Sequence, residues 1–236
     1  AIRVICCELA RISAHLLGLG AFAMDVGAVT VFLWTFTERE KIYNLIELLT
    51  GARFTTSYTR VGGQTRDLPP TFLAALKDFT TSFRKVHADL HSMLTRNRIF
   101  IDRTKDIGVI SKEDAIAYGI SGPNLRGSGI EHDLRRKHPY LDYEKYDFEI
   151  PVGTVGDCFD RYLVRMEEMR QSCNILDQVV ATIPGGAINI HDPKSTLPGK
   201  EAVLTKMEEL IHHFIVATEG VEAPAEAMAG PGARPR

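Results

Sequence analysis

Apolar residues recur every three or four positions along most of the chain, which is the spacing of helices that bury one face. The first such stretch covers residues 1–24, and its apolar stripe consists of Ile2, Ile5, Leu9, Ile12, Leu16 and Leu19. A second helix is predicted to begin at Thr37, where Thr-Glu-Arg-Glu forms a capping box with Glu40. This helix is expected to end at Gly51, because glycine suits the position after a helix.

Further long and short helices follow in the same way. Asp67-Leu-Pro-Pro stops the chain and starts a helix over about 71–94. Ser111-Lys-Glu-Asp opens a short helix that Gly119 closes. A long helix is predicted over about 156–183, in which Asp157 precedes Arg161 by four residues, the favourable order for an ion pair. The last helix is predicted over about 200–218.

Residues 121–156 depart from the helical pattern. They are rich in Gly, Pro, Asp and Tyr, and a weak alternation over 143–150 is compatible with a strand. The fold is therefore predicted to be mainly α, a multihelical bundle with an irregular, partly β insert. Residues 1–222 form its helical domain, and the composition of residues 223–236 predicts a disordered tail.

The segment from Leu16 to Phe36 is the most apolar part of the chain. Its 21 residues carry a single charge, Asp25, and their length would suffice to cross a bilayer. However, a central aspartate costs about 2.5–3.5 kcal/mol on insertion, and no basic cluster flanks the segment. We therefore favour a segment buried inside the protein over a membrane span.

Composition excludes several function classes. The chain of 236 residues is 44% hydrophobic, enough for one sizeable core, and its 28 basic residues are interleaved with 30 acidic ones rather than gathered for nucleic acid. The four cysteines are Cys6, Cys7, Cys158 and Cys173. They include no CxxC pair, so neither a zinc ribbon nor a self-contained iron–sulfur site is predicted. We expect reduced thiols and no metal site.

The run over residues 122–172 contains GPNLRGSGIEHDLRR and GDCFDRYLVRMEEMRQS, whose glycine and arginine content is unusual for a generic core. The other distinctive blocks are IRVICCELARISAHLLGLGAFAMDVGAVTVFLWTFTEREKIYNLIELLTGARF at 2–54, YTRVGGQTRDLP at 58–69, NRIFIDRTKDIGVISKEDAIAYG at 97–119 and MEELIHHFIVATEG at 207–220. Together they resemble the NuoD family of respiratory complex I, whose mitochondrial member is called the 49-kilodalton subunit. That family is related to the large subunits of nickel–iron hydrogenases, and the resemblance covers about residues 1–222.

The resemblance implies a core subunit in the peripheral arm of a proton-translocating NADH:quinone oxidoreductase, on the cytoplasmic or matrix face of the membrane. Such a subunit forms one wall of the quinone-reduction site and holds no redox centre of its own. Quinone is the substrate, and the terminal 4Fe–4S cluster belongs to the small iron–sulfur partner subunit. Other peripheral-arm subunits, and membrane-arm subunits at the junction, are the further expected partners.

Two alternatives remain beside this hypothesis. A large subunit of the nickel–iron hydrogenase type would need two CxxC motifs, and none is present. A non-catalytic scaffold fragment would bind the iron–sulfur partner without supporting quinone chemistry. The family's PQHPSTHG-like loop and RxDY-like segment, which hold the quinone head group, have no counterpart here, so we expect an internal portion of a longer subunit.

Asp25 is the sharpest catalytic candidate, because an acid within an apolar segment must find a partner or change its pKa. A structural aspartate satisfied by backbone amides or an arginine is the alternative. The resemblance favours function, since Met24-Asp25-Val26-Gly27-Ala28 matches the motif whose aspartate couples quinone reduction to proton movement. Four residues align with the family's quinone channel, and ordinary core packing is their alternative: Leu17, Ala21, Phe32 and Leu33.

Glu8, Arg11 and His15 share one helical face, so a proton relay is conceivable, although an ordinary buried ion pair with one satisfied histidine is favoured. Thr55 stands where the family has a histidine next to the terminal cluster, which predicts a cluster potential that depends less on pH. Arg60 remains available as a positive charge near that cluster, or as part of a surface ion pair.

Several other motifs are interpreted as structural. The segment Arg126-Gly-Ser-Gly129 is expected to be a tight turn at a subunit contact, because it lacks the third glycine and the strand–helix context of a nucleotide-binding loop. The pairs His212-His213 and His132-Asp133 lack the spacing of metal ligands.

Overall fold

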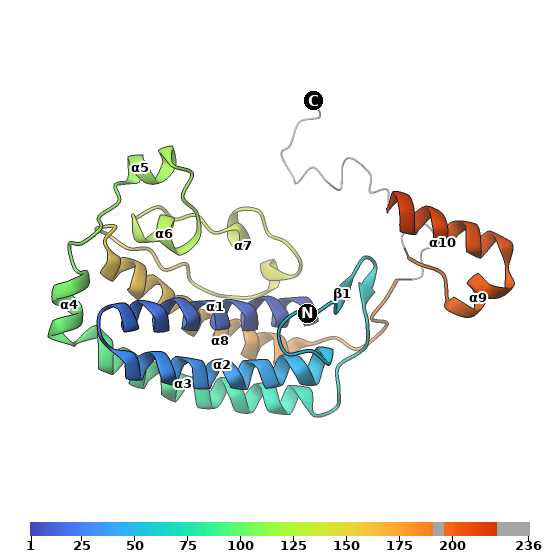
Figure 1. The fold of residues 1–236 in the computed structure, drawn as a ribbon, viewed down its shortest axis with the longest axis horizontal. Helices are drawn as coiled ribbons and strands as arrows, with labels where there is room; N and C mark the ends of the chain where they lie inside the picture. Colours follow the sequence, from blue (N-terminus) through green and yellow to red (C-terminus); the bar gives the residue numbers. More distant parts are fainter. Residues whose placement is uncertain (191–195, 221–236) are drawn as a thin grey trace. The chain divides into compact units, whose positions relative to one another are not determined.

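The computed structural model describes residues 1–190 and 196–220 (Figure 1). The chain forms two compact units. Unit 1 comprises residues 1–54 and 68–184, and unit 2 comprises residues 55–67 together with the residues that follow 184. The predicted tail over residues 223–236 lies outside the described residues.

Four long helices build unit 1: α1 (Ile2–Asp25), α2 (Val29–Thr50), α3 (Phe72–Thr95) and α8 (Cys158–Thr182). Helix α1 packs against α2 and α8, and α3 packs against the same two helices. Figure 1 shows the four lying side by side as a bundle. The predicted mainly α, multihelical fold is therefore confirmed.

Helix α1 lies against both α2 and α8. Its predicted apolar stripe is buried from Ile5 to Leu19, with Ile5, Leu9, Ile12 and Leu16 fully inaccessible. By length and hydropathy α1 could also cross a membrane, but 56% of its most apolar window is buried inside the protein. A helix in the core of a protein also meets this criterion of length and hydropathy, because a helix that is covered by protein on most sides is apolar on most sides.

The second helix begins eight residues earlier than predicted. Gly27, with φ of 96°, lies in the short turn between α1 and α2, and α2 starts at Val29. The hydroxyl of Thr37 donates to the carbonyl of Leu33 within α2, so the predicted capping box at Thr37 does not form. Helix α2 buries a stripe that extends through this position and favours a continuous helix: Val31, Thr35, Glu38, Ile42, Leu45 and Leu49.

Gly20 lets α1 and α2 approach closely, since a Cβ there would lie 2.3 Å from Oγ1 of the fully buried Thr35. We expect Gly20→Ala to destabilise the chain by about 1–2 kcal/mol, because overpacking costs more than the helix propensity gained. Thermal unfolding or limited proteolysis measures the loss. The double variant Gly20→Ala, Thr35→Ala removes the clash and should be more stable than Gly20→Ala alone. Strictly additive effects would contradict this contact.

The connection from α3 to α8 is an irregular insert with short helices: α4 (Arg98–Thr104), α5 (Lys112–Ala117), α6 (Gly122–Gly127), α7 (Leu134–Lys137) and the 3₁₀ helix η1 (Tyr143–Lys145). Ser111 caps α5 as predicted. The prediction of a possible strand over 143–150 is wrong, because the structure has no strand there. Backbone amides of Asp147 and Glu149 bond to glutamine side chains of α8, so no neighbouring strand is needed.

Asp157 caps α8 but does not pair with Arg161. Its carboxylate accepts from the backbone amides of Asp160 at 2.7 Å and Asp106 at 2.8 Å. The guanidinium of Arg161 bonds instead to carbonyl oxygens of Gly156 and Gly108. The predicted ion pair is therefore wrong, because the orphan amides at the helix start compete for the carboxylate.

Unit 2 contains the β structure. Strands β1 (Thr59–Arg60) and β2 (Gly63–Gln64) form an antiparallel hairpin with Thr59 opposite Gln64. The side-chain oxygen of Asn189 accepts a hydrogen bond from the backbone amide of Gln64 at 2.6 Å. Helices α9 (Lys200–Thr205) and α10 (Met207–Glu219) pack together. The single helix predicted over 200–218 is thus broken at Lys206, whose backbone is extended.

Candidate functional site

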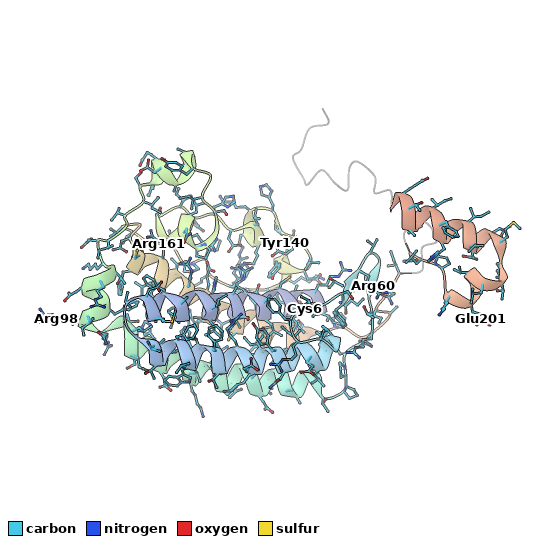
Figure 2. All side chains as sticks on the ribbon, viewed as in Figure 1. Cys6, Arg60, Arg98, Tyr140, Arg161 and Glu201 are labelled. Carbon is cyan, nitrogen blue, oxygen red and sulfur yellow. The ribbon has the colours of Figure 1, made fainter. Side chains whose placement is uncertain are left out.

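A cavity of about 330 Å³ lies in unit 1 between the C-terminal half of α1, helix α6 and the N-terminal part of α8. Arg161, labelled in Figure 2, reaches it from the first turn of α8. The lining residues are Gly18, Leu19, Ala21, Phe22, Asp25, Asn124, Cys158, Arg161, Tyr162 and Arg165. One wall is therefore largely apolar, and the opposite wall carries two arginines.

Asp25 is the last residue of α1, and its side chain is exposed to the cavity rather than buried. Its carboxylate makes no hydrogen bond or ion pair within residues 1–190 and 196–220. The alternative of a buried structural aspartate is therefore wrong. An acid in the last turn of a helix also faces the negative end of the helix dipole, which costs about 0.3–1 kcal/mol.

Leu17, Ala21 and Asp25 follow one another at intervals of four residues, so they share a face of α1. Ala21 and Asp25 line the cavity, whereas Leu17 is 42% exposed beside them. Phe32 and Leu33 lie on α2 and do not line the cavity. Leu33 is 61% exposed, so ordinary core packing does not describe Leu17 or Leu33.

Phe32 is partly covered by its own helix and by α1. Its ring centroid lies 4.4 Å from that of Phe36, and its atoms approach within 3.4 Å of a Cβ built at Gly20. Phe32 therefore has the packing expected of a core residue at the boundary between α1 and α2.

Glu8 lies at the centre of a buried polar cluster that joins α1, α8 and the insert. Its fully buried carboxylate accepts from the hydroxyl of Tyr143 at 2.5 Å and from that of Ser172 at 2.6 Å. The guanidiniums of Arg135 and Arg11 each lie 3.3 Å from it. Both oxygens of Glu8 thus face donors, as a buried carboxylate requires.

Glu168 forms the second centre of the same cluster. Its fully buried carboxylate accepts from Arg126 and lies 2.6 Å from Nε2 of His15. Asp133 joins the two centres, because its carboxylate lies 2.8 Å from Arg135 and 3.8 Å from Arg126. Glu8 and His15 therefore belong to one polar cluster, although no contact joins them directly within the described part of the chain.

The polar cluster is electrically balanced. It contains three carboxylates, Glu8, Asp133 and Glu168, and three guanidiniums, Arg11, Arg126 and Arg135. Burial lowers the pKa of His15 despite the neighbouring Glu168 carboxylate, which favours the neutral form of the imidazole. Burial would raise the pKa of Asp133, but hydrogen bonds and charge from Arg135 outweigh it and lower the pKa to about 2.

The arginines of the cavity differ from those of the polar cluster. Arg161 donates to carbonyl oxygens and to Sγ of Cys158 at 3.1 Å, and Arg165 donates to the carbonyl of Arg161 at 2.8 Å and to Oδ1 of Asn124 at 2.9 Å. Neither forms an ion pair in the portion of the chain that the structure describes. Burial lowers the pKa of Arg165.

Thr55 and Arg60 belong to unit 2. Thr55 is exposed before the hairpin, and Arg60 is an exposed residue of β1 opposite Gly63. All four cysteines are free, and burial raises the pKa of Cys6 to about 11 and that of Cys173 to about 12. No group of three metal-ligating side chains occurs among the described residues.

Sequence reasoning missed most members of the polar cluster outside α1. Arg126 was expected in a turn at a subunit contact, but it is 4% exposed and bound to Glu168. A signal was present in α8, where Glu168 and Ser172 interrupt the otherwise apolar stripe Val164, Ile175 and Val179. Polar residues at buried positions of a helix demand polar partners elsewhere in the chain.

Comparison with known proteins gives a consistent result. The model of the family described as "Respiratory-chain NADH dehydrogenase, 49 Kd subunit" matches residues 25–236. The chain is 67% identical over 235 residues to the D subunit of NADH-quinone oxidoreductase from Methylacidiphilum infernorum, covering 100% of this chain and 56% of that protein. It is 59% identical over 226 residues to a D subunit of the same enzyme from Opitutus terrae, covering 95% and 53% respectively.

The chain thus spans about half the length of the curated relatives that it matches. The matched residues contain Asp25 and both arginines of the cavity, as well as most of the polar cluster. On the extent of the family match and on the identity to these relatives, the chain belongs to the family of the 49 Kd subunit of respiratory-chain NADH dehydrogenase.

Proposed function

We propose that this chain is a core component of an NADH:quinone oxidoreductase and that its cavity forms one wall of the quinone-reduction site. The family membership and the names of the relatives support the reaction class. The observation that carries the proposal is the unpartnered carboxylate of Asp25, among the described residues, at the edge of a cavity with an apolar wall.

The cavity has the size for a quinone ring rather than for the whole molecule. Ligand sites range from about 300 to 1,000 Å³, and this cavity of about 330 Å³ is at the small end. Ala21 and Phe22 would contact the flat faces of the ring. Leu17 and Leu33, which are exposed on α1 and on α2, would contact the apolar tail, and Phe32 would support them.

Asp25 is the proposed proton donor. Quinone takes up two electrons and two protons on reduction, and a carboxylic acid at the ring can supply one of those protons. The chain is proposed to contribute no redox centre, so the electrons come from the 4Fe–4S cluster that the family resemblance assigns to the small iron–sulfur subunit. The remaining partners are proposed to be other peripheral-arm subunits and the membrane arm, with the chain peripheral on the cytoplasmic face.

Of the three residues considered for a proton relay, Glu8, Arg11 and His15, only one is proposed to take part. Glu8 and Arg11 are held in a balanced ion-pair network, which suits a structural role. His15 is hydrogen-bonded to Glu168 and lies one helical turn from Gly18 at the cavity. We therefore propose His15 alone as a group that exchanges protons with the site.

Blocking the cavity tests this function. Ala21→Phe places a ring in the cavity, so quinone reduction by the intact membrane complex should fall at least about tenfold, because the substrate ring is excluded. Electron transfer from NADH to hexacyanoferrate should persist, since that acceptor does not need the quinone site. Ala74→Phe, at an exposed position of α3, is the matched control. Undiminished quinone reduction in assembled Ala21→Phe complex would contradict the proposal.

The absence of a histidine at position 55 makes a separate prediction about the partner's cluster. Thr55→Val should leave the pH dependence of the cluster potential unchanged, because neither side chain titrates. Thr55→His should introduce a slope of up to about 59 mV per pH unit, since reduction would then bind a proton. Redox titrations of the cluster signal by electron paramagnetic resonance at several pH values measure it. A steep slope in the unmodified complex would refute this account of Thr55.

A further inference from the structure

Arg161 and Arg165 are adjacent cations on one wall of the cavity, four residues apart on α8. Like charges at this spacing destabilise a helix by a few tenths of a kcal/mol. Both side chains are half-buried, and the Nε atom of Arg165 lies 3.9 Å from a Cβ built at Gly18 across the cavity. The two guanidiniums are held by carbonyl and amide oxygens rather than by an acid.

None of the nearby acids forms an ion pair with either arginine among the described residues. Glu168, one turn from Arg165, is taken by Arg126 and His15. Asp157 accepts backbone amides, and Asp160 accepts those of Thr154, Val155 and Gly156. Asp25 lines the same cavity, yet no ion pair joins it to either arginine in the described part of the chain.

By contrast, the buried arginines Arg126 and Arg135 each bind carboxylates directly. The positive wall of the cavity is therefore a place in unit 1 where half-buried guanidinium charge remains without an anion among the described residues. Donors that are fixed before the reaction stabilise negative charge more strongly than water does, because they need not reorient.

We propose that Arg165, supported by Arg161, stabilises the negative charge that develops on a ring oxygen of quinone during its reduction. This inference rests on the proposed function. Each electron arrives from the reduced iron–sulfur cluster of the partner subunit, and the ring oxygen becomes anionic before it is protonated. Asp25, protonated by solvent beforehand, then gives its proton to that oxygen: the O–H bond of the acid breaks and the O–H bond of the reduced ring forms. The other ring oxygen takes its proton from solvent, and solvent reprotonates the Asp25 carboxylate.

Arg165 is the better target for a test than Arg161, which holds two loop carbonyls. Two quinone analogues of similar size serve as probes of binding in the intact membrane complex. The first is 2-hydroxy-1,4-naphthoquinone, which is anionic at neutral pH, and the second is neutral 2-methyl-1,4-naphthoquinone. In Arg165→Gln, binding of the anionic analogue should weaken at least about tenfold. Binding of the neutral analogue should change little, and kcat for quinone should fall more than KM rises.

Arg165→Lys keeps the charge and should recover part of the anion binding. Arg98→Gln removes the same charge from a side chain that is 93% exposed and should change neither analogue. Equal weakening of both analogues in Arg165→Gln, or no weakening of either, would overturn the inference. If Ala21→Phe also leaves both analogues bound, the proposed function itself fails. If Ala21→Phe excludes both while Arg165→Gln does not discriminate, only the role of Arg165 fails.

Discussion

Asp25→Asn should reduce quinone reduction by the intact membrane complex by about 10²-fold or more, with assembly unchanged. General acids contribute about 10²–10⁴-fold to the reactions that they serve, and an amide cannot donate the proton that a carboxylic acid donates. Assembly should be normal because the exposed carboxylate forms no ion pair in the described structure and its replacement is isosteric. NADH-dependent quinone reduction, normalised to the amount of assembled complex, measures the effect.

The control for this variant is Asp102→Asn, which removes an acid that is 65% exposed and outside the cavity. Asp25→Glu provides a second comparison, since it keeps the proton but moves it by one methylene. It should retain more activity than Asp25→Asn. Full activity in assembled Asp25→Asn complex would make Asp25 dispensable and would leave the scaffold hypothesis in its place.

Glu8→Ala should have the largest effect on stability. Removing this carboxylate leaves the guanidinium of Arg135 with one fewer partner and strips the hydroxyls of Tyr143 and Ser172 of their acceptor. Breaking a buried ion pair in this way costs about 3–5 kcal/mol. The chain should therefore disappear from the assembled complex or become sensitive to limited proteolysis. Glu8→Gln should be less damaging, because its amide oxygen still accepts one of the hydrogen bonds.

The comparison variant is Glu40→Ala, which removes an exposed ion pair with Arg53 on the surface of unit 1. Exposed pairs of this kind contribute little to stability, so its protease resistance should match that of the unmodified chain. Similar losses in Glu8→Ala and Glu40→Ala would show that the polar cluster contributes no more than a surface ion pair.

Local sequence rules predicted the helices that bury a regular apolar stripe. Helix α3 and helix α8 agree with their predicted ranges within a few residues. The start of α2 was wrong because packing against α1 extends the helix through Thr37, and a capping box is worth less than a buried stripe. The strand over 143–150 was wrong because its amides bond to side chains of α8, a partner far away in the sequence.

The candidate site was predictable only in part. Asp25 was identified by its charge in an apolar segment and by the family motif. Its exposure at the end of α1 was not predicted. The apolar pattern continues from Leu16 to Phe36 and gave no sign that the helix ends at Asp25, before the turn that contains Gly27. The two arginines of the cavity were not predicted as site residues, because the pattern of charges on one helix does not show which arginine lacks an acidic partner. That property depends on contacts among α1, α6 and α8.

The most direct test is a structure of the intact complex with a short-chain quinone bound, at a resolution that places the ring. The account predicts that the ring lies against Ala21 and Phe22, with one oxygen close to Asp25 and within reach of Arg165. A ring bound elsewhere, with this cavity filled by another segment of protein, would contradict it.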